Sequence, residues 1–459
     1  MQTTFQSASR QITASLGLAA LTLMGLAAAP AAQAQTYTLN TLATFDGVNG
    51  QVPVGGLTLI GTTLYGDTLQ GGLGFGSGNP GNGTVFSVPI SGGAITSLAS
   101  LGQSNLSNPS GGLTLIGSTL YGTTISGGTS NDGAVFSIPV AGGAPSVLSS
   151  FDASSGYSPE GNLVQVGGTL YGTQLGPATT TGRGSVFSVP LGGGTPTNLA
   201  TFNGANGAYP FGGLTLVGNT FYGTTYQGGD NNDGAVFSVP VGGTTPILLA
   251  SFSNNTNGGG PRGSLTLSAD GKTLYGTTSG LNNSMGGDGT VFSIPVGGGP
   301  LTVLASFNKT NGYEPLSNLT LSADGSTLYG TTYGSANSVP DSFFGGGTVF
   351  SVSTKGGAVN DLYTFSGTDG SNPSGSLTLI GDTLYGTTTT GGANGDGTVF
   401  SLTPAAVPEA SSLVSFSLLL LGGLAGMALR ARQRRAVGEV HSRCSIPPAE
   451  PSRMPKPSV

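Results

Sequence analysis

The segment Gly111–Pro139 reads GGLTLIGSTLYGTTISGGTSNDGAVFSIP. It contains three short runs rich in Leu, Thr, Val, Tyr and Phe, and clusters of Gly, Asn and Asp separate them. Such runs predict β-strands joined by tight turns. A fourth run, SVLSSF, follows and ends at Phe151. The segment therefore predicts a unit of four short strands.

The same unit occurs seven times. The marker TLYG or its variant FYG places a tyrosine in each unit, at intervals of 56, 50, 51, 53, 54 and 56 residues. VFS and a run of the form LASF each recur seven times in the same cyclic order. Four strands in about 50 residues match a β-propeller blade of the kelch size class. The tyrosines are Tyr65, Tyr121, Tyr171, Tyr222, Tyr275, Tyr329 and Tyr385.

The two ends of the repeat array complement each other. The seventh unit, Gly375–Leu402, lacks its last strand, whereas an unmatched strand, Leu42–Phe45, precedes the first unit. Pairing the two would close a ring and remove two open sheet edges. We therefore expect an all-β, seven-bladed propeller over residues 35–406, closed by the N-terminal strand. The alternative is an open β-solenoid, which needs no complementary ends.

Composition excludes several kinds of protein. The 459 residues include 84 glycines and 27 prolines, too little glycine for collagen, and 7% charged residues, too few for a disordered chain kept open by its charge. The single histidine, His441, and single cysteine, Cys444, both lie beyond the repeats. The repeats therefore offer no imidazole base, thiolate nucleophile or ordinary zinc site. We expect no enzyme and no cofactor.

Residues 1–34 have the pattern of a secretory signal. Arg10 precedes an apolar run from Ile12 to Ala29, and AAQA follows and ends at Ala34. This order of a basic region, an apolar region and a small-residue site predicts cleavage between Ala34 and Gln35, with an uncleaved membrane anchor as the alternative. The secretion machinery is then an expected partner.

The C-terminal region has the pattern of a membrane anchor. Residues 410–429 contain no charge over twenty positions, long enough as a helix to cross a bilayer. The arginines that follow favour the cytoplasmic side and place the repeats outside the cell. Residues 407–435 form this region, and residues 436–459 are expected to be a disordered tail. The basic cluster consists of Arg430, Arg432, Arg434 and Arg435.

Two resemblances follow from these motifs. Val407-Pro408-Glu409, the apolar stretch and the arginines resemble the PEP-CTERM sorting signal of bacteria that make exopolysaccharide. That resemblance implies processing by an exosortase, although Ala410 stands where a second proline is usual and the tail is longer than normal. The LYGTT, GG and GTVFS elements over residues 37–404 resemble GloVer-type tandem repeats of exported bacterial proteins. This resemblance implies export and repetition but no chemistry.

The loops that vary in length mark the expected binding face. They join TLYGTT to GTVFS and LASF to GGLTL, and we call this side of the propeller the loop face. Its eleven acidic residues against three basic ones give a net charge of −8, whereas the opposite face has −1. This balance argues against binding nucleic acid, which needs a basic surface. Cations and neutral glycans remain possible ligands, and Tyr157, Tyr209 and Tyr313 are candidates to contact a sugar.

Two chemical sites are weaker hypotheses. Calcium would use Asp230, Asn232 and Asp233 in the string DNNDG, which lacks the distal glutamate of an EF-hand. The similar strings SNDG and NGDG elsewhere favour a shared turn. A glycosidase or lyase would pair Glu160 with Glu314 in one cleft. The leading hypothesis is an exported, surface or matrix protein with a structural or interaction role linked to extracellular polysaccharide, with a carbohydrate- or calcium-binding module as the alternative.

Overall fold

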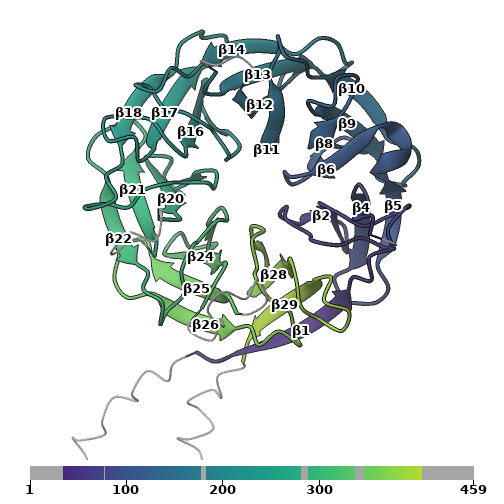
Figure 1. The fold of residues 1–459 in the computed structure, drawn as a ribbon. Coiled ribbons are helices and arrows are strands. Elements are labelled where there is room, and N and C mark those ends of the chain that lie inside the picture. The colour runs from purple at the N-terminus through teal and green to yellow at the C-terminus, as the bar shows by residue number, and fades with distance from the viewer. Residues whose placement is uncertain (1–34, 77, 177–181, 281–287, 336–345, 406–459) are drawn as a thin grey trace, which may run out of the picture. The chain divides into compact units, whose positions relative to one another are not determined.

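The structure, a computed structural model, describes residues 35–76, 78–176, 182–280, 288–335 and 346–405. Residues 37–404 form seven antiparallel sheets arranged as blades around a central axis (Figure 1). The predicted all-β propeller with seven blades is therefore confirmed. The signal-like segment, Val407-Pro408-Glu409, the apolar stretch 410–429, the arginine cluster and the tail all lie outside the described residues. No helix among the described residues is long and apolar enough to cross a membrane.

Each blade runs from the axis outward in four strands, and we number the blades by their innermost strands. The innermost strands are β2 (Thr58–Ile60), β7 (Thr114–Ile116), β11 (Tyr157–Val166), β15 (Thr215–Val217), β19 (Thr266–Leu267), β23 (Thr320–Leu321) and β27 (Thr378–Ile380). The second strands are β3 (Thr63–Thr68), β8 (Thr119–Gly127), β12 (Thr169–Gly176), β16 (Thr220–Thr225), β20 (Thr273–Thr278), β24 (Thr327–Thr332) and β28 (Thr383–Thr388).

The third strands carry the VFS marker and the fourth strands the LASF marker. The third strands are β4 (Thr84–Pro89), β9 (Ala134–Pro139), β13 (Ser185–Pro190), β17 (Ala235–Pro240), β21 (Thr290–Pro295), β25 (Thr348–Ser353) and β29 (Thr398–Pro404). The outermost strands are β5 (Thr96–Ser100), β10 (Ser146–Ser150), β14 (Thr197–Thr201), β18 (Ile247–Ser251), β22 (Thr302–Ser306), β26 (Asn360–Thr364) and, completing blade 7, β1 (Tyr37–Thr44).

The ring closes as the sequence predicts. β1 pairs antiparallel with β29 from Tyr37 opposite Pro404 to Thr44 opposite Thr398, with a bulge between Thr41 and Ala43. The pairing is longer than the four-residue run that predicted it. Because both ends of the array share one sheet, the open solenoid is excluded.

Blade 2 departs from the four-strand expectation. Directly after β5 of blade 1, and before the first strand of blade 2, the chain forms a short 3-10 helix, η1 (Leu101–Ser104), in which Leu101 stands where the other repeats have phenylalanine. Asn105 then takes a left-handed conformation, and an additional strand, β6 (Leu106–Pro109), pairs with the extended end of β8. The sheet of blade 2 consequently has five strands.

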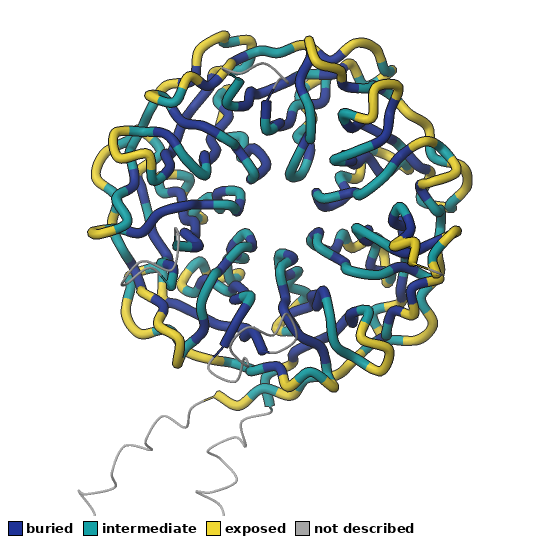
Figure 2. Tube along the Cα trace, in the orientation of Figure 1, coloured by how far each residue is buried: buried dark blue, intermediate teal, exposed yellow. Residues whose placement is uncertain are grey.

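The apolar core lies between the blades. Figure 2 shows the buried residues along the inner parts of the blades and the exposed ones mainly at the outer edge of the ring. Each of seven clusters joins strands of two neighbouring blades; for example, Phe252 of blade 4 packs with Leu274 and Phe292 of blade 5. Phe252 and Phe292 meet edge to face at 4.9 Å between ring centres. The glycine of TLYG permits this packing: a Cβ on Gly276 would stand 2.5 Å from the Phe292 ring. The Tyr, Phe and Leu markers therefore have a structural role.

Threonine hydrogen bonds also join neighbouring blades. In the innermost strands of six blades, the threonine hydroxyl donates to the carbonyl of a leucine in the next blade, at 2.5 to 2.8 Å. The bond from Thr378 to Leu57 crosses the closure of the ring. Blade 3 has Val164 at this position and cannot donate, so the bond to Leu214 of blade 4 is missing.

Candidate functional site

A pocket of about 310 Å³ lies where the seven innermost strands begin, at the axis on the loop face. Seven copies of the same short segment line it, each reading Pro, a variable residue, Gly or Ser, a second small or amide residue, and Leu. We call the variable residues the rim residues. They are Val54, Ser110, Glu160, Phe211, Arg262, Leu316 and Ser374. Such a volume is at the small end of the range for small-molecule sites.

The proline of each segment fixes its position against the preceding blade. All seven prolines are buried. The residue before each one has a left-handed backbone, as in Val52 (φ 57°), Tyr209 (φ 59°) and Glu314 (φ 54°), a conformation that costs energy for most residues. Its N–H donates to a carbonyl at the end of the preceding blade's long loop, at 2.7 to 3.2 Å in all seven copies. These bonds hold the rim residues at matching places around the axis.

The glycine that follows six of the seven rim residues allows the segments to approach one another. A Cβ on Gly111 would lie 2.3 Å from the Gly161 carbonyl oxygen, and one on Gly375 would lie 2.5 Å from that of Gly55. Neighbouring backbones therefore touch around the axis. The rim residue, half-buried in all seven copies, is free to point elsewhere.

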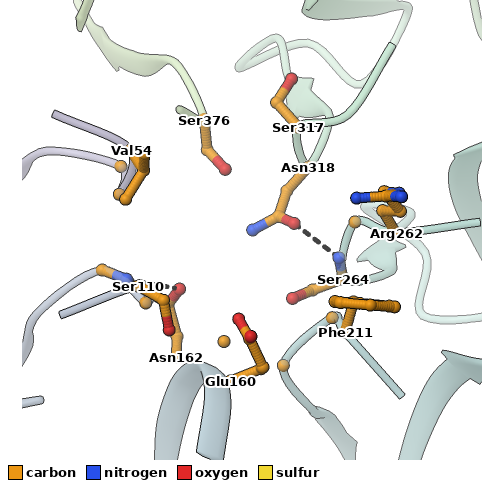
Figure 3. A pocket seen from close by; sticks show the side chains of 18 of the residues that line it. Val54, Ser110, Glu160, Asn162, Phe211, Arg262, Ser264, Ser317, Asn318 and Ser376 are labelled. Carbon is orange, nitrogen blue, oxygen red and sulfur yellow. Dashed lines mark hydrogen bonds between the residues drawn. The ribbon is translucent and has the colours of Figure 1, made fainter. Parts of the chain in front are cut away.

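Two amide side chains have fixed orientations in the pocket. The Asn162 Oδ1 accepts from the Gly112 N–H at 3.2 Å, and the Asn318 Oδ1 accepts from the Ser264 N–H at 2.5 Å. Each amide nitrogen is left as a donor for something else, and in Figure 3 that of Asn318 points toward the middle of the pocket. The hydroxyl of Ser374 is buried without a hydrogen-bond partner among the described residues. The pocket thus presents several groups suited to ligand hydroxyls.

Glu160 is the acidic residue of the pocket lining. Its carboxyl points toward the middle of the pocket (Figure 3). Burial raises the pKa of this carboxyl to about 7, although the Ser110 hydroxyl and the positive charge of Arg262 act in the opposite direction. A carboxyl group that half-ionises near neutrality can accept hydrogen bonds from a ligand or bind a cation.

Arg262 lies to one side, against aromatic rings. Its guanidinium carbon stands 4.9 Å from the centre of the Phe211 ring and 4.6 Å from that of Tyr226. These two rings meet edge to face at 5.5 Å. Cation–π attraction holds the guanidinium there. Within the described residues no ion pair joins Arg262 to Glu160.

The loop tyrosines chosen from the sequence do not line this pocket. Tyr209 is one of the left-handed residues before proline, and its N–H donates to the Arg183 carbonyl. Tyr157 begins β11, and Tyr313 pairs through its backbone with Gly334. Their placement is set by the connection between blades.

The two carboxylates proposed for a glycosidase, Glu160 and Glu314, do not face the same cavity. Glu160 lines the pocket and Glu314 does not. Glu314 is the left-handed residue before Pro315, and burial raises the pKa of its carboxyl while Arg262 lowers it. Both carboxyls therefore lie within the electrostatic reach of Arg262, but only one faces the cavity.

The oxygens proposed for calcium take part in the turn. Asn232 Oδ1 accepts from the Gly228 N–H at 3.2 Å, and Asp233 Oδ2 accepts from the Asn254 N–H at 2.9 Å. Asp230 is exposed, and its N–H donates to the Ser251 hydroxyl. Over the described ranges, no three carboxylate, histidine or cysteine side chains come together as a metal site. Asp233-Gly234 stands directly before β17, the third strand of its blade.

Behind the rim, Asp67 occupies a position that threonine has in the other six blades. The equivalent threonines of blades 3 to 5 donate to a rim carbonyl of the next blade, at 2.8 to 3.1 Å. Asp67 is 1% exposed, and neither carboxyl oxygen has a hydrogen-bond partner within the described chain. Burial raises the pKa of Asp67 to about 8. A carboxylate cannot donate to the carbonyl that faces it, which makes this group unfavourable when charged.

Sequence reasoning missed the rim residues as a group. The signal was present, because a proline stands two positions before the glycine or serine of the rim in every repeat. Aligning the repeats on these prolines would have shown one position whose chemistry changes from blade to blade. Of the seven, the sequence points to Glu160 as a site residue, for glycoside cleavage, and to Arg262 only as a base of the loop face.

The fold and pocket define a closed β-propeller built from tandem repeats. The model of the Gloeobacter/Verrucomicrobia repeat matches residues 29–179, 176–340 and 282–424. The chain belongs to this family. No curated protein matches the sequence.

Solved structures share the architecture at low identity. The extracellular domain of a protein assigned as a hybrid two-component system in B. thetaiotaomicron is 12% identical, with a TM-score of 0.50 over 82% of this chain and 40% of that one. The phage phi92 endosialidase is 12% identical, with a TM-score of 0.45 over 82% of this chain and 70% of that one. A Mycobacterium tuberculosis puromycin-hydrolyzing peptidase is 14% identical, with a TM-score of 0.43 over 77% and 52%. The first likeness supports the fold alone.

Proposed function

We propose that this chain is an exported, surface- or matrix-associated protein with a non-catalytic interaction role, and that its propeller holds a sugar residue in the pocket at the rim. One observation carries the binding role. Residues that pack between blades are nearly the same in all seven repeats, whereas the rim residues include aliphatic, hydroxyl, acidic, aromatic and basic side chains. A ring needed only for support would gain nothing from such differences.

A sugar suits the groups that the pocket offers. The amide nitrogens of Asn162 and Asn318 donate, the serine hydroxyls both donate and accept, and Glu160 accepts. Val54, Leu316 and Phe211 add apolar surface for the C–H groups of a sugar ring. A few placed polar groups among apolar ones are typical of specific small-ligand sites.

Export and the link to polysaccharide rest on the sequence. The signal-like residues 1–34 support secretion, and Val407-Pro408-Glu409 with its apolar stretch and arginines supports sorting by an exosortase. A membrane tether through residues 410–429 would keep the loop face outside the cell. Extracellular polysaccharide is then the available source of sugar.

Binding of defined saccharides to the full chain tests this function. Calorimetry with a panel of neutral, amino and N-acetylated disaccharides should find saturable binding to at least one member, weakened at least tenfold by Phe211→Ala. Asp382→Asn, an exposed change on the opposite face, should leave binding unchanged. The absence of binding to every member would overturn the function, and so would cleavage of a saccharide that Glu160→Gln abolishes.

A further inference from the structure

The ionisable group in the middle of the pocket is acidic. Glu160 points its carboxyl there, and among the described residues that line the pocket it is the one acid. Arg262 is the one basic residue among the described residues of the lining, and it lies to the side of the pocket in Figure 3. Its guanidinium is held over the Phe211 and Tyr226 rings. The charge of Arg262 lowers the pKa of both the Glu160 and the Glu314 carboxyls. In the part of the chain that the structure describes, no ion pair joins the Arg262 guanidinium to the Glu160 carboxyl.

The surroundings strengthen this negative character. The pocket opens on the loop face, whose sequence carries a net charge of −8. A cavity at the centre of a surface of one sign attracts ligands of the opposite sign and repels those of the same sign. An acidic sugar would be disfavoured on approach, and a neutral sugar would not make use of the charge. A cationic ligand would gain both on approach and in the pocket.

Several polar side chains near the Glu160 carboxyl could form hydrogen bonds with the hydroxyl groups of a ligand. Ser264, Asn318 and Ser376 point polar atoms inward in Figure 3, and Ser110 lies close enough to Glu160 to affect its pKa. A bare metal ion would leave these donors unused, since amide nitrogens do not bind hard cations. A ligand that carries a positive group together with several hydroxyls would use the whole set.

Resting on the proposed function, we infer that the sugar held at the rim carries a free, protonated amino group, and that Glu160 is the residue that binds it. The ammonium group would donate to the Glu160 carboxylate, and the hydroxyls would meet Asn162, Asn318 and the serines. Charge-assisted hydrogen bonds of this kind are about twice as strong as neutral ones.

Matched disaccharides separate this inference from the function on which it rests. The probes are β-1,4-linked diglucosamine, its di-N-acetylated form and cellobiose, which share a backbone and differ at the 2-position. Calorimetry on the full chain at low ionic strength should give diglucosamine an affinity at least tenfold above the other two. Glu160→Gln should remove most of that preference, and Asp382→Asn should not. Circular dichroism and a thermal melt would show that both variants are folded.

Each outcome decides one of the two proposals. Equal affinity for the three disaccharides, or a preference that Glu160→Gln does not reduce, would overturn the inference while the function stands. Binding to none of these probes or the wider saccharide panel would overturn the function itself. A preference that rises in high salt would also contradict the inference, because screening weakens an ammonium–carboxylate contact.

Discussion

The interior between the blades and the rim around the axis come from the same repeat but follow different rules. Between blades, phenylalanine meets phenylalanine edge to face in six of the seven junctions, and Leu101 takes the place of the ring in the remaining one. At the rim, one backbone arrangement presents side chains of very different chemistry. The repeat thus separates stability from recognition: the interior cannot vary without loss of packing, and the rim can.

The largest expected contrast comes from one aromatic residue in each region. Phe292→Ala removes a fully buried ring and should lower the free energy of unfolding by about 3 to 5 kcal/mol. Phe211→Ala removes a half-buried ring and should lower it by about 1 kcal/mol or less, from lost contact with Arg262. Urea unfolding followed by fluorescence or circular dichroism measures both. Equal losses would mean that the rim is part of the core.

Asp67 extends the comparison because it is an ionisable residue in the interior between the blades, where the other blades have threonine. Its folded-state pKa is raised to about 8 from 3.8, so the folded state binds the proton more tightly than the unfolded chain. The stabilising contribution of this proton is complete below about pH 4 and is lost as the pH rises toward 8. Asp67→Thr should therefore stabilise the protein, more at pH 8 than at pH 5.

Thermal melts at these two pH values, with wild type and variant side by side, test the effect. The gain should reach several kcal/mol at pH 8, because the threonine also restores the donor found in the neighbouring blades. Asp382→Thr, an exposed change, serves as the control and should show no such pH dependence. A gain that is the same at both pH values would show that Asp67 is not titrating.

The smallest expected effects concern the threonine bonds between innermost strands. Thr378→Val removes the bond to Leu57 at the ring closure and should cost about 1 kcal/mol. Val164→Thr supplies the missing donor between blades 3 and 4 and should gain about 0.5 to 1 kcal/mol, since Val164 stands opposite Tyr171 in the same register. Chemical denaturation can resolve this pair. If both variants lowered the free energy of unfolding, or both raised it, the stabilising role of the threonine bond would be contradicted.

The sequence predicts the ring well because its markers are packing residues. Tyr, Phe and Gly of TLYG and VFS recur since each must fit the same space, as Gly276 must leave room for Phe292. The pairing of β1 with β29 follows from a simple count of strands. The added strand β6 escaped prediction because Leu106–Pro109 lacks alternating apolar residues and depends on the left-handed turn at Asn105.

The pocket is harder to predict from the sequence because no local spacing joins its members. Glu160, Phe211 and Arg262 stand about fifty residues apart and meet only through the rotation of the ring. Tyr157, Tyr209 and Tyr313 are aromatic loop residues and therefore candidates for sugar contact. Their backbones instead form the strand, the turn before proline and the bridge that connect neighbouring blades. The net charge of the loop face can be counted from the sequence. The position of Arg262 over the Phe211 and Tyr226 rings cannot, because it depends on how neighbouring blades are placed in space.

The pairing of β1 with β29 has a consequence for the order of events when the chain is made. β1 is the first strand of the propeller to be synthesised, and its partner, which ends at Pro404, is the last. The first strand must wait with its edge unsatisfied until nearly the entire array has emerged, and closing so long a loop is slow. Any product that stops short of β29 leaves the ring open at blade 7. Pairing of β1 with β29 therefore occurs only in full-length molecules. Incomplete chains would keep open strand edges, and proteases would cleave them faster than the closed ring.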